Sequence, residues 1–126
     1  MRALAGAIAA IALLAVLAAC GGGGGGGGSA QPAGSIKVTL TEYSYKPSTI
    51  SAPSGKVVFY LINVGTKAHD MIIVDSSNKT VASSALVSAG DAFVFTVDSI
   101  AAGTYTFYCD QPGHKEAGMT GTLTVT

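Results

Sequence analysis

The sequence predicts an all-β domain, a sandwich or barrel of short strands, and three observations lead to this fold class. Apolar and polar residues alternate along several short segments rich in β-branched and aromatic residues, as they do in strands that bury one face. Gly, Pro, Asn and Ser residues separate these segments at short intervals, which is typical of turns between strands. No long stretch shows the periodicity of an amphipathic helix. A chain of 126 residues allows one such domain.

The expected strands follow from these alternations in chain order. In the first, Ile36, Val38 and Leu40 face one way while lysine and threonine face the other. A continuous apolar run at 70–75 is expected of a strand that is buried on both faces. Residues 82–88 are ambiguous. The full set of expected strands is 36–41, 56–63, 70–75, 91–98, 104–109 and a last strand around Leu123 and Val125.

The N-terminal residues 1–19 have the layout of a secretory signal peptide. Arg2 gives a positively charged start, and an almost unbroken apolar run continues to residue 17. The Leu-Ala-Ala that precedes Cys20 resembles a bacterial lipobox, whose cysteine becomes the lipidated first residue of a lipoprotein. We therefore expect an exported protein, anchored to the cell membrane by lipid on Cys20 and facing the periplasm or the cell exterior. An ordinary signal peptide or a signal anchor is the alternative, since the apolar run is short for a membrane span.

Residues 20–35 are expected to be a flexible linker. Gly21 to Gly28 are eight consecutive glycines, which bury no side chains and cannot build a core. A Gly-rich coil of this length has a root-mean-square reach of about 22 Å. The folded domain is expected to occupy residues 36–126, where the strand patterns lie.

Charge gives little indication of a partner. Lysine plus arginine and aspartate plus glutamate each number 7, so the formal net charge is zero. Without a basic patch or charge run, nucleic acid is not an expected partner.

The residues with the most distinctive chemistry are Cys109, His114 and Met119, spaced Cys-x4-His-x4-Met. His69 is the only other histidine in the chain. One thiolate, two imidazoles and a thioether are the ligands of a mononuclear copper centre that transfers electrons. Strand parity places Cys109 inward, at the end of the strand 104–109, and Pro112-Gly113 is expected to turn the chain so that His114 returns to the same point.

Each of these residues has an ordinary explanation when it is taken alone. Cys109 could be a small buried side chain or pair with Cys20 in a disulfide, and a single methionine is usually core filler. Met71 is a rival thioether, but it lies within an apolar run and is interpreted as core. Zinc is not expected, since there is no Cys-x2-Cys and a structural zinc site does not use methionine. It is the combination of ligand types in one loop that predicts copper.

These residues resemble the cupredoxin family of small type 1 blue copper proteins, which includes plastocyanin, azurin and auracyanin. The resemblance lies in GTYTFYC at 103–109, PGH at 112–114 and GMTG at 118–121. It implies a Greek-key β-sandwich or barrel of about seven to eight strands with one type 1 copper ion near one end. The edge of His114 would be the electron port, surrounded by the small and apolar residues Pro112, Gly113, Ala117 and Gly118.

Asn63 and Asp70 are expected to lie around the ligands. Asn63-x-Gly65 with His69 is similar to the loop of the first ligand in the family. In many members an Asn follows this histidine and ties the two ligand loops together, whereas here the residue is Asp70, whose ionised carboxylate can only accept hydrogen bonds. The backbone N–H of Asp70 could still reach the sulfur.

The functional prediction is a membrane-tethered carrier of single electrons that acts as a monomer between redox protein partners. The alternative is a copper-binding lipoprotein for copper delivery or storage with the same ligands. An enzyme is not expected, because two histidines cannot supply a second copper or a substrate position. An interaction domain without metal would leave Cys109 unexplained.

Overall fold

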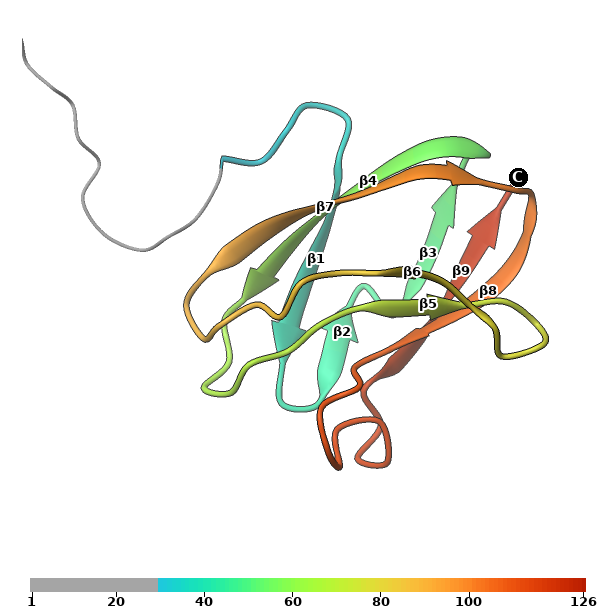
Figure 1. Cartoon of the computed structure of the whole chain (residues 1–126). Helices are drawn as coiled ribbons and strands as arrows, with labels where there is room; N and C mark the ends of the chain where they lie inside the picture. Colours follow the sequence, from blue (N-terminus) through green and yellow to red (C-terminus); the bar gives the residue numbers. More distant parts are fainter. Residues whose placement is uncertain (1–29) are drawn as a thin grey trace, which may run out of the picture.

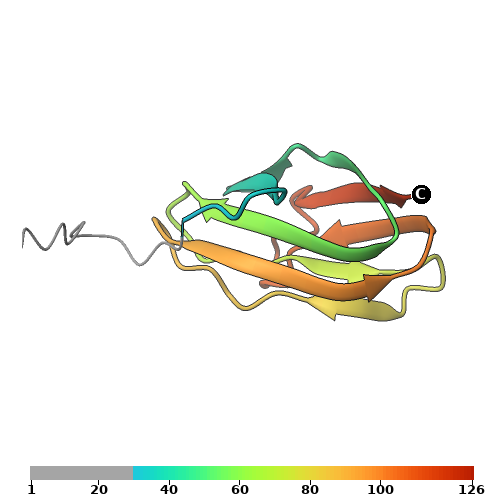
Figure 2. The same ribbon diagram turned by 90° about the horizontal axis from the view of Figure 1, so that it is seen from above.

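The computed structural model describes residues 30–126, which form two β-sheets packed face to face (Figure 1; Figure 2 gives the view from above). One sheet has the strand order β2-β1-β4-β7 and the other β3-β9-β8-β5-β6. The nine strands of this part of the chain are β1 (Ile36–Thr41), β2 (Ser44–Lys46), β3 (Thr49–Ala52), β4 (Gly55–Asn63), β5 (Ile72–Val74), β6 (Thr80–Ser83), β7 (Ala92–Ile100), β8 (Gly103–Tyr108) and β9 (Thr120–Val125). The predicted all-β sandwich is confirmed.

The predicted signal peptide (1–19), the lipidation site Cys20 and the glycine run lie outside the described residues, so these assignments stay predictions. Within residues 30–126 no helix is long and apolar enough to span a membrane.

The segments with strong alternation form strands close to the predicted bounds. β1 matches 36–41, and β4 covers the β-branched and aromatic run expected at 56–63, with Val57, Phe59 and Leu61 among its buried side chains. The apolar run at 70–75 contributes only the short strand β5, whose three residues are all buried. It is shorter because the N–H of Met71 donates to Oγ of Ser84 at one end, and the N–H of Asp75 donates to the carbonyl of Lys79 in a turn at the other.

Three short strands, β2, β3 and β6, add to the six expected from the residue patterns, so this part of the chain has nine strands, close to the about seven to eight that the resemblance implies. β2 pairs with β1 in one sheet, whereas β3 pairs in parallel with β9 in the other. The chain therefore crosses between the sheets at Pro47, a residue that has no N–H to continue a ladder. The ambiguous segment 82–88 begins with the end of β6, which pairs with β5.

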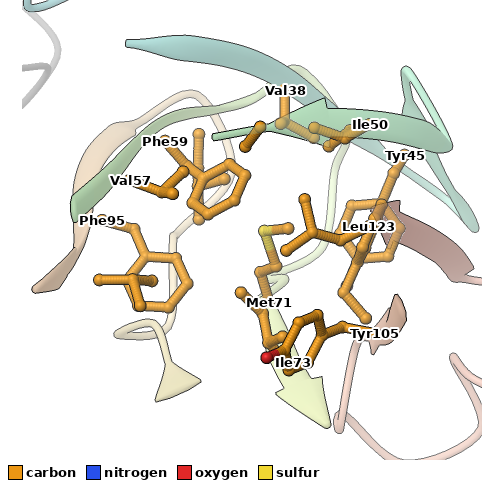
Figure 3. Packing of buried hydrophobic residues seen from close by; sticks show 14 of the residues in the cluster. Val38, Tyr45, Ile50, Val57, Phe59, Met71, Ile73, Phe95, Tyr105 and Leu123 are labelled. Carbon is orange, nitrogen blue, oxygen red and sulfur yellow. The ribbon is translucent and has the colours of Figure 1, made fainter. Parts of the chain in front are cut away.

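The core lies between the sheets and is filled by inward-facing side chains of both (Figure 3). Phe59 and Leu123 are fully buried, and Tyr45 meets Phe107 edge to face with ring centroids 4.9 Å apart. Met71 is also fully buried in this cluster, so its interpretation as a core residue is confirmed. Cys109 and Met119 belong to the same cluster, which continues the core up to the ligand loop.

Strand direction decides where the N-terminal end of the domain lies. β1 runs parallel to β4, with Ile36 opposite Phe59 and Leu40 opposite Asn63. Because Asn63 ends β4 beside the loop that carries the first histidine, β1 starts at the opposite end of the sandwich. Figure 1 shows this, with the start of β1 at the top and the loop between β8 and β9 at the bottom.

Candidate metal centre

Three potential metal ligands converge at one end of the sandwich: His69, Cys109 and His114. The two Nδ1 atoms are 3.1 Å apart, and the sulfur is 3.9 Å from Nδ1 of His69 and 3.4 Å from Nδ1 of His114. Atoms that share one ion at about 2.0–2.3 Å are separated by distances of this order. All three residues are buried. The structure therefore brings together two nitrogens and a sulfur that fit one metal ion, and this donor set suits copper.

Strand β8 positions Cys109. Tyr105 and Phe107 point into the core, and Cys109, two residues further on, faces the same way and is fully buried. It is a free thiol. Burial raises the pKa of the Cys109 thiol, and hydrogen bonding from the backbone N–H groups of Asp70 and Gln111 opposes this rise. A coordinated metal ion deprotonates such a thiol outright, so binding would convert it to the strongly donating thiolate.

The loop from Cys109 to Met119 is closed by its own backbone hydrogen bonds. The N–H of Met119 donates to the carbonyl of His114 at 3.0 Å, and the N–H of Cys109 donates to the carbonyl of Met119 at 3.2 Å. These bonds place Met119, which is fully buried, beside the two ligands of the same loop.

Two glycines give this loop its shape. Gly113 has φ +81° and Gly118 has φ +106°, values that favour glycine. The turn at Gly113 was predicted. No atom lies within 4 Å of where a Cβ at Gly118 would be, so it is the backbone conformation that requires a glycine there.

Asn63 organises the loop of the first histidine. Its Nδ2 donates to the carbonyls of Lys67 at 2.7 Å and Val87 at 2.9 Å, and its Oδ1 accepts the N–H of Gly65 at 2.9 Å. Val87 in turn exchanges two backbone hydrogen bonds with His69. A single buried amide therefore holds the chain on both sides of the imidazole.

Asp70 links the two ligand loops as an acceptor. Its Oδ1 accepts the N–H of Asp110 at 2.9 Å, and its backbone carbonyl accepts the hydroxyl of Tyr45 at 2.6 Å. Burial, with a contribution from the neighbouring Asp110 side chain, raises the pKa of Asp70 to about 6. The tie between the loops needs only an acceptor, so an aspartate supplies it where many cupredoxins have an asparagine.

His114 lies at the boundary between the core and the solvent. It is 8% exposed, and the ring of Tyr43 meets it edge to face with centroids 4.9 Å apart. Burial, followed by the nearby His69, lowers the pKa of His114, which favours the neutral imidazole that a metal needs.

Sequence reasoning missed Tyr43, which packs against His114, and Tyr45, which donates to Asp70. It also missed a contact to His69. Glu42, in the turn between β1 and β2, places its Oε1 3.0 Å from Nε2 of His69. The contact joins residues 27 positions apart, and nothing in the local sequence of the turn indicates it.

A buried cysteine sulfur and two imidazoles at the end of a β-sandwich define a small mononuclear copper protein of the blue, electron-carrying class. The chain belongs to the cupredoxin-like domain family, whose family model matches residues 6–125. The family resemblance predicted from the ligand loop is confirmed.

Known proteins agree with this assignment. Plastocyanin of Prochlorothrix hollandica is 33% identical over 106 residues, which cover 77% of this chain and 79% of that protein. Auracyanin-B of Chloroflexus aurantiacus is 50% identical over 42 residues, which cover 33% of this chain and only 18% of the auracyanin. The solved structure of auracyanin B has a TM-score of 0.67 at 24% identity, over 78% of this chain and 92% of that one, a likeness that concerns the fold.

Proposed function

We propose that this protein carries single electrons between redox proteins, using one type 1 copper ion held by His69, Cys109, His114 and Met119. The observation that supports it best is the convergence of two Nδ1 atoms and a sulfur within 4.8 Å of one another, all buried. Copper, when bound there, supplies the change between Cu(I) and Cu(II). Met119 would supply a fourth, weaker donor to the ion, because the backbone closes the loop beside Cys109 and a thioether is a soft, weak ligand.

The protein's contribution is to hold these atoms still. The first-ligand loop is fixed by Asn63, and the Cys109 loop is fixed by its own backbone bonds. Asp70 joins the two loops. Ligand atoms that are fixed from several sides keep similar positions in both oxidation states, so little has to rearrange when an electron arrives or leaves.

The proposed route for the electron is the edge of His114. This ring is the one ligand of the buried trio with measurable exposure, at 8%, whereas His69 and Cys109 are at 0%. Tyr43, which packs against it, is itself 37% exposed. A partner that covers this end of the sandwich would come within contact distance of a ligand ring.

The experiment is a visible and electron-spin spectrum of the purified protein with Cu(II), followed by redox titration. We expect an intense blue thiolate-to-copper absorption that a reductant bleaches and an oxidant restores. Cys109→Ser should abolish the colour. Met119→Leu should alter the spectrum, whereas Met71→Leu, in the core, should leave it unchanged. A colourless protein with stoichiometric copper would refute the proposal.

Copper delivery or storage by the same ligands is the competing function. It predicts rapid transfer of copper to a chelator and slow electron exchange with small redox reagents. Full burial of two ligands argues for slow release, because a delivery site needs a path by which an acceptor can reach the metal. Measuring both rates on one sample separates the two functions.

We also propose that the protein is an exported monomer, tethered to the membrane by lipid on Cys20, with no role for nucleic acid. Support comes from the signal-like residues 1–19, the lipobox-like residues before Cys20 and the glycine run that follows. Fatty-acid labelling of the wild type and of Cys20→Ser tests it. Label and membrane association should both disappear in the variant, and label that persists would contradict the assignment.

A further inference from the structure

Glu42 contacts the first histidine on the side of the ring away from the other ligands. Nδ1 of His69 faces His114 and Cys109, whereas Nε2 lies 3.0 Å from Oε1 of Glu42. The same carboxylate oxygen accepts the backbone N–H groups of Thr66 at 2.9 Å and Lys67 at 2.7 Å. One oxygen of the β1–β2 turn therefore holds both the imidazole and the loop that carries it.

We propose that Glu42 is a positioning residue for His69: it fixes the proton on Nε2, directs the bare Nδ1 toward the metal and favours the oxidised form of the site. The tautomer part of this proposal stands on its own, and the part about oxidation state rests on the proposed copper function.

The tautomer follows from the chemistry of the two partners. A neutral imidazole has one N–H and one lone pair, and an ionised carboxylate can only accept. The proton must then be on Nε2, which leaves the lone pair of Nδ1 pointing at the ligand cluster. A glutamate carboxyl is ordinarily ionised at neutral pH, and here its Oε1 already accepts two backbone N–H groups, those of Thr66 and Lys67. A carboxylate on the outer nitrogen of a metal-bound histidine orients the ring and makes it a stronger donor.

The surrounding structure is built to admit this carboxylate. A Cβ at Gly65 would lie 2.5 Å from Oε1 and 2.8 Å from Oε2 of Glu42, so only a glycine leaves room for the carboxylate at this point of the loop. No positive φ requires a glycine at residue 65. Close packing against Glu42 is therefore what favours glycine here, and Gly65→Ala offers an independent way to displace the same carboxylate.

The charge of Glu42 acts differently on the two oxidation states. The oxidised site has one positive charge more than the reduced site, so a fixed carboxylate behind His69 attracts it more strongly. Removing the charge should weaken Cu(II) binding more than Cu(I) binding, and the reduction potential should rise. If Cu(II) affinity falls ten times more than Cu(I) affinity, the reduction potential of this one-electron couple rises by about 59 mV.

The test uses the full chain and four variants. Glu42→Gln keeps an acceptor oxygen and the shape but removes the charge, and Glu42→Ala removes both. Gly65→Ala displaces the carboxylate without changing its chemistry. Glu116→Gln is the matched control, because Glu116 is an exposed acid of the ligand loop and removing it deletes a carboxylate that does not hold His69.

The first measurement is the ¹⁵N spectrum of His69 in the metal-free protein at pH 8, which needs no copper. The wild type and Glu116→Gln should show the Nε2–H tautomer, and Glu42→Ala and Gly65→Ala a mixture of tautomers. An unchanged Nε2–H tautomer in Glu42→Ala would overturn the positioning role. If that variant fails to fold, the same result in Gly65→Ala overturns it.

The second measurement is the affinity for Cu(I) and Cu(II) by competition, together with the reduction potential. Glu42→Ala should lose about 10- to 100-fold in Cu(II) affinity. Glu42→Gln should lose less and still show a higher potential than the wild type. Equal potentials in the wild type and Glu42→Gln would overturn the electrostatic part. A protein with the expected tautomer but without a blue spectrum would instead contradict the proposed function and leave the role of Glu42 in orienting His69 intact.

Discussion

The hydroxyl of Tyr45 allows a sharp test of how the core supports the ligand loops. It donates to the backbone carbonyl of Asp70 at 2.6 Å, and both residues are buried, at 3% and 5% exposure. Tyr45→Phe keeps the ring and its edge-to-face packing on Phe107 but leaves a buried carbonyl without its donor. An unsatisfied buried group costs about 1–3 kcal/mol, so we expect a loss of about 2 kcal/mol. In a domain of this size that lowers the melting temperature by about 8–16 °C.

Tyr105→Phe is the matched control. The hydroxyl of Tyr105 also donates to a backbone carbonyl, that of Ala101 at 2.7 Å, but Ala101 is exposed. Because water can replace the lost donor there, the cost should be near the low end for a hydrogen bond, about 0.5 kcal/mol. The assay is thermal and urea unfolding of the metal-free protein. Equal losses in the two variants, or a larger loss in Tyr105→Phe, would refute the reasoning that burial of the acceptor sets the cost.

Three further outcomes follow from the structure. Asp70→Asn should keep the bond from the N–H of Asp110, since an amide oxygen also accepts, and should keep the blue spectrum at a higher reduction potential; loss of the spectrum would contradict this. Gly121→Ala should destabilise the fold by about 1–3 kcal/mol, because a Cβ there collides with the ring of Phe107 and with the backbone carbonyl oxygen of Ser48; calorimetry should show this loss, and a variant as stable as the wild type would contradict it. Copper at a thousand times its dissociation constant should add about 4.1 kcal/mol of stability, measured as a rise in melting temperature, and a much smaller rise would mean that the unfolded chain binds copper too.

Much of the fold and of the ligand cluster could be predicted because the determining patterns are local. The alternation of Tyr105 and Phe107 fixes the direction of Cys109 two residues later, and the structure shows all three facing the core. His114 and Met119 follow in the same loop, so their closeness to Cys109 needs only a turn, which Gly113 provides.

The rest depends on contacts between distant parts of the chain. Glu42 meets His69 across 27 residues, and only the paired sheets bring its turn to the histidine. β2 has three residues and β3 four, too few for alternation to be recognised. Asp70 can join the two ligand loops only if its partner is a hydrogen-bond donor, because an ionised carboxylate only accepts. The partner is the backbone N–H of Asp110, which the sequence does not reveal.

The direction of β1 has a practical consequence for how the molecule meets a surface. Its first residue lies opposite Phe59 and its fifth opposite Asn63, so the strand advances about 13 Å toward the ligand end. A protein immobilised on an electrode through the segment before Ile36 would stand with His114 turned to the solution. Dissolved partners could then exchange electrons with it freely, while direct current to the electrode would have to cross the length of the sandwich. Attachment through an engineered cysteine near Tyr43 would turn His114 toward the electrode, which would favour direct current and hinder exchange with dissolved partners. The position of attachment alone would therefore decide whether the protein exchanges electrons with the electrode or with the solution.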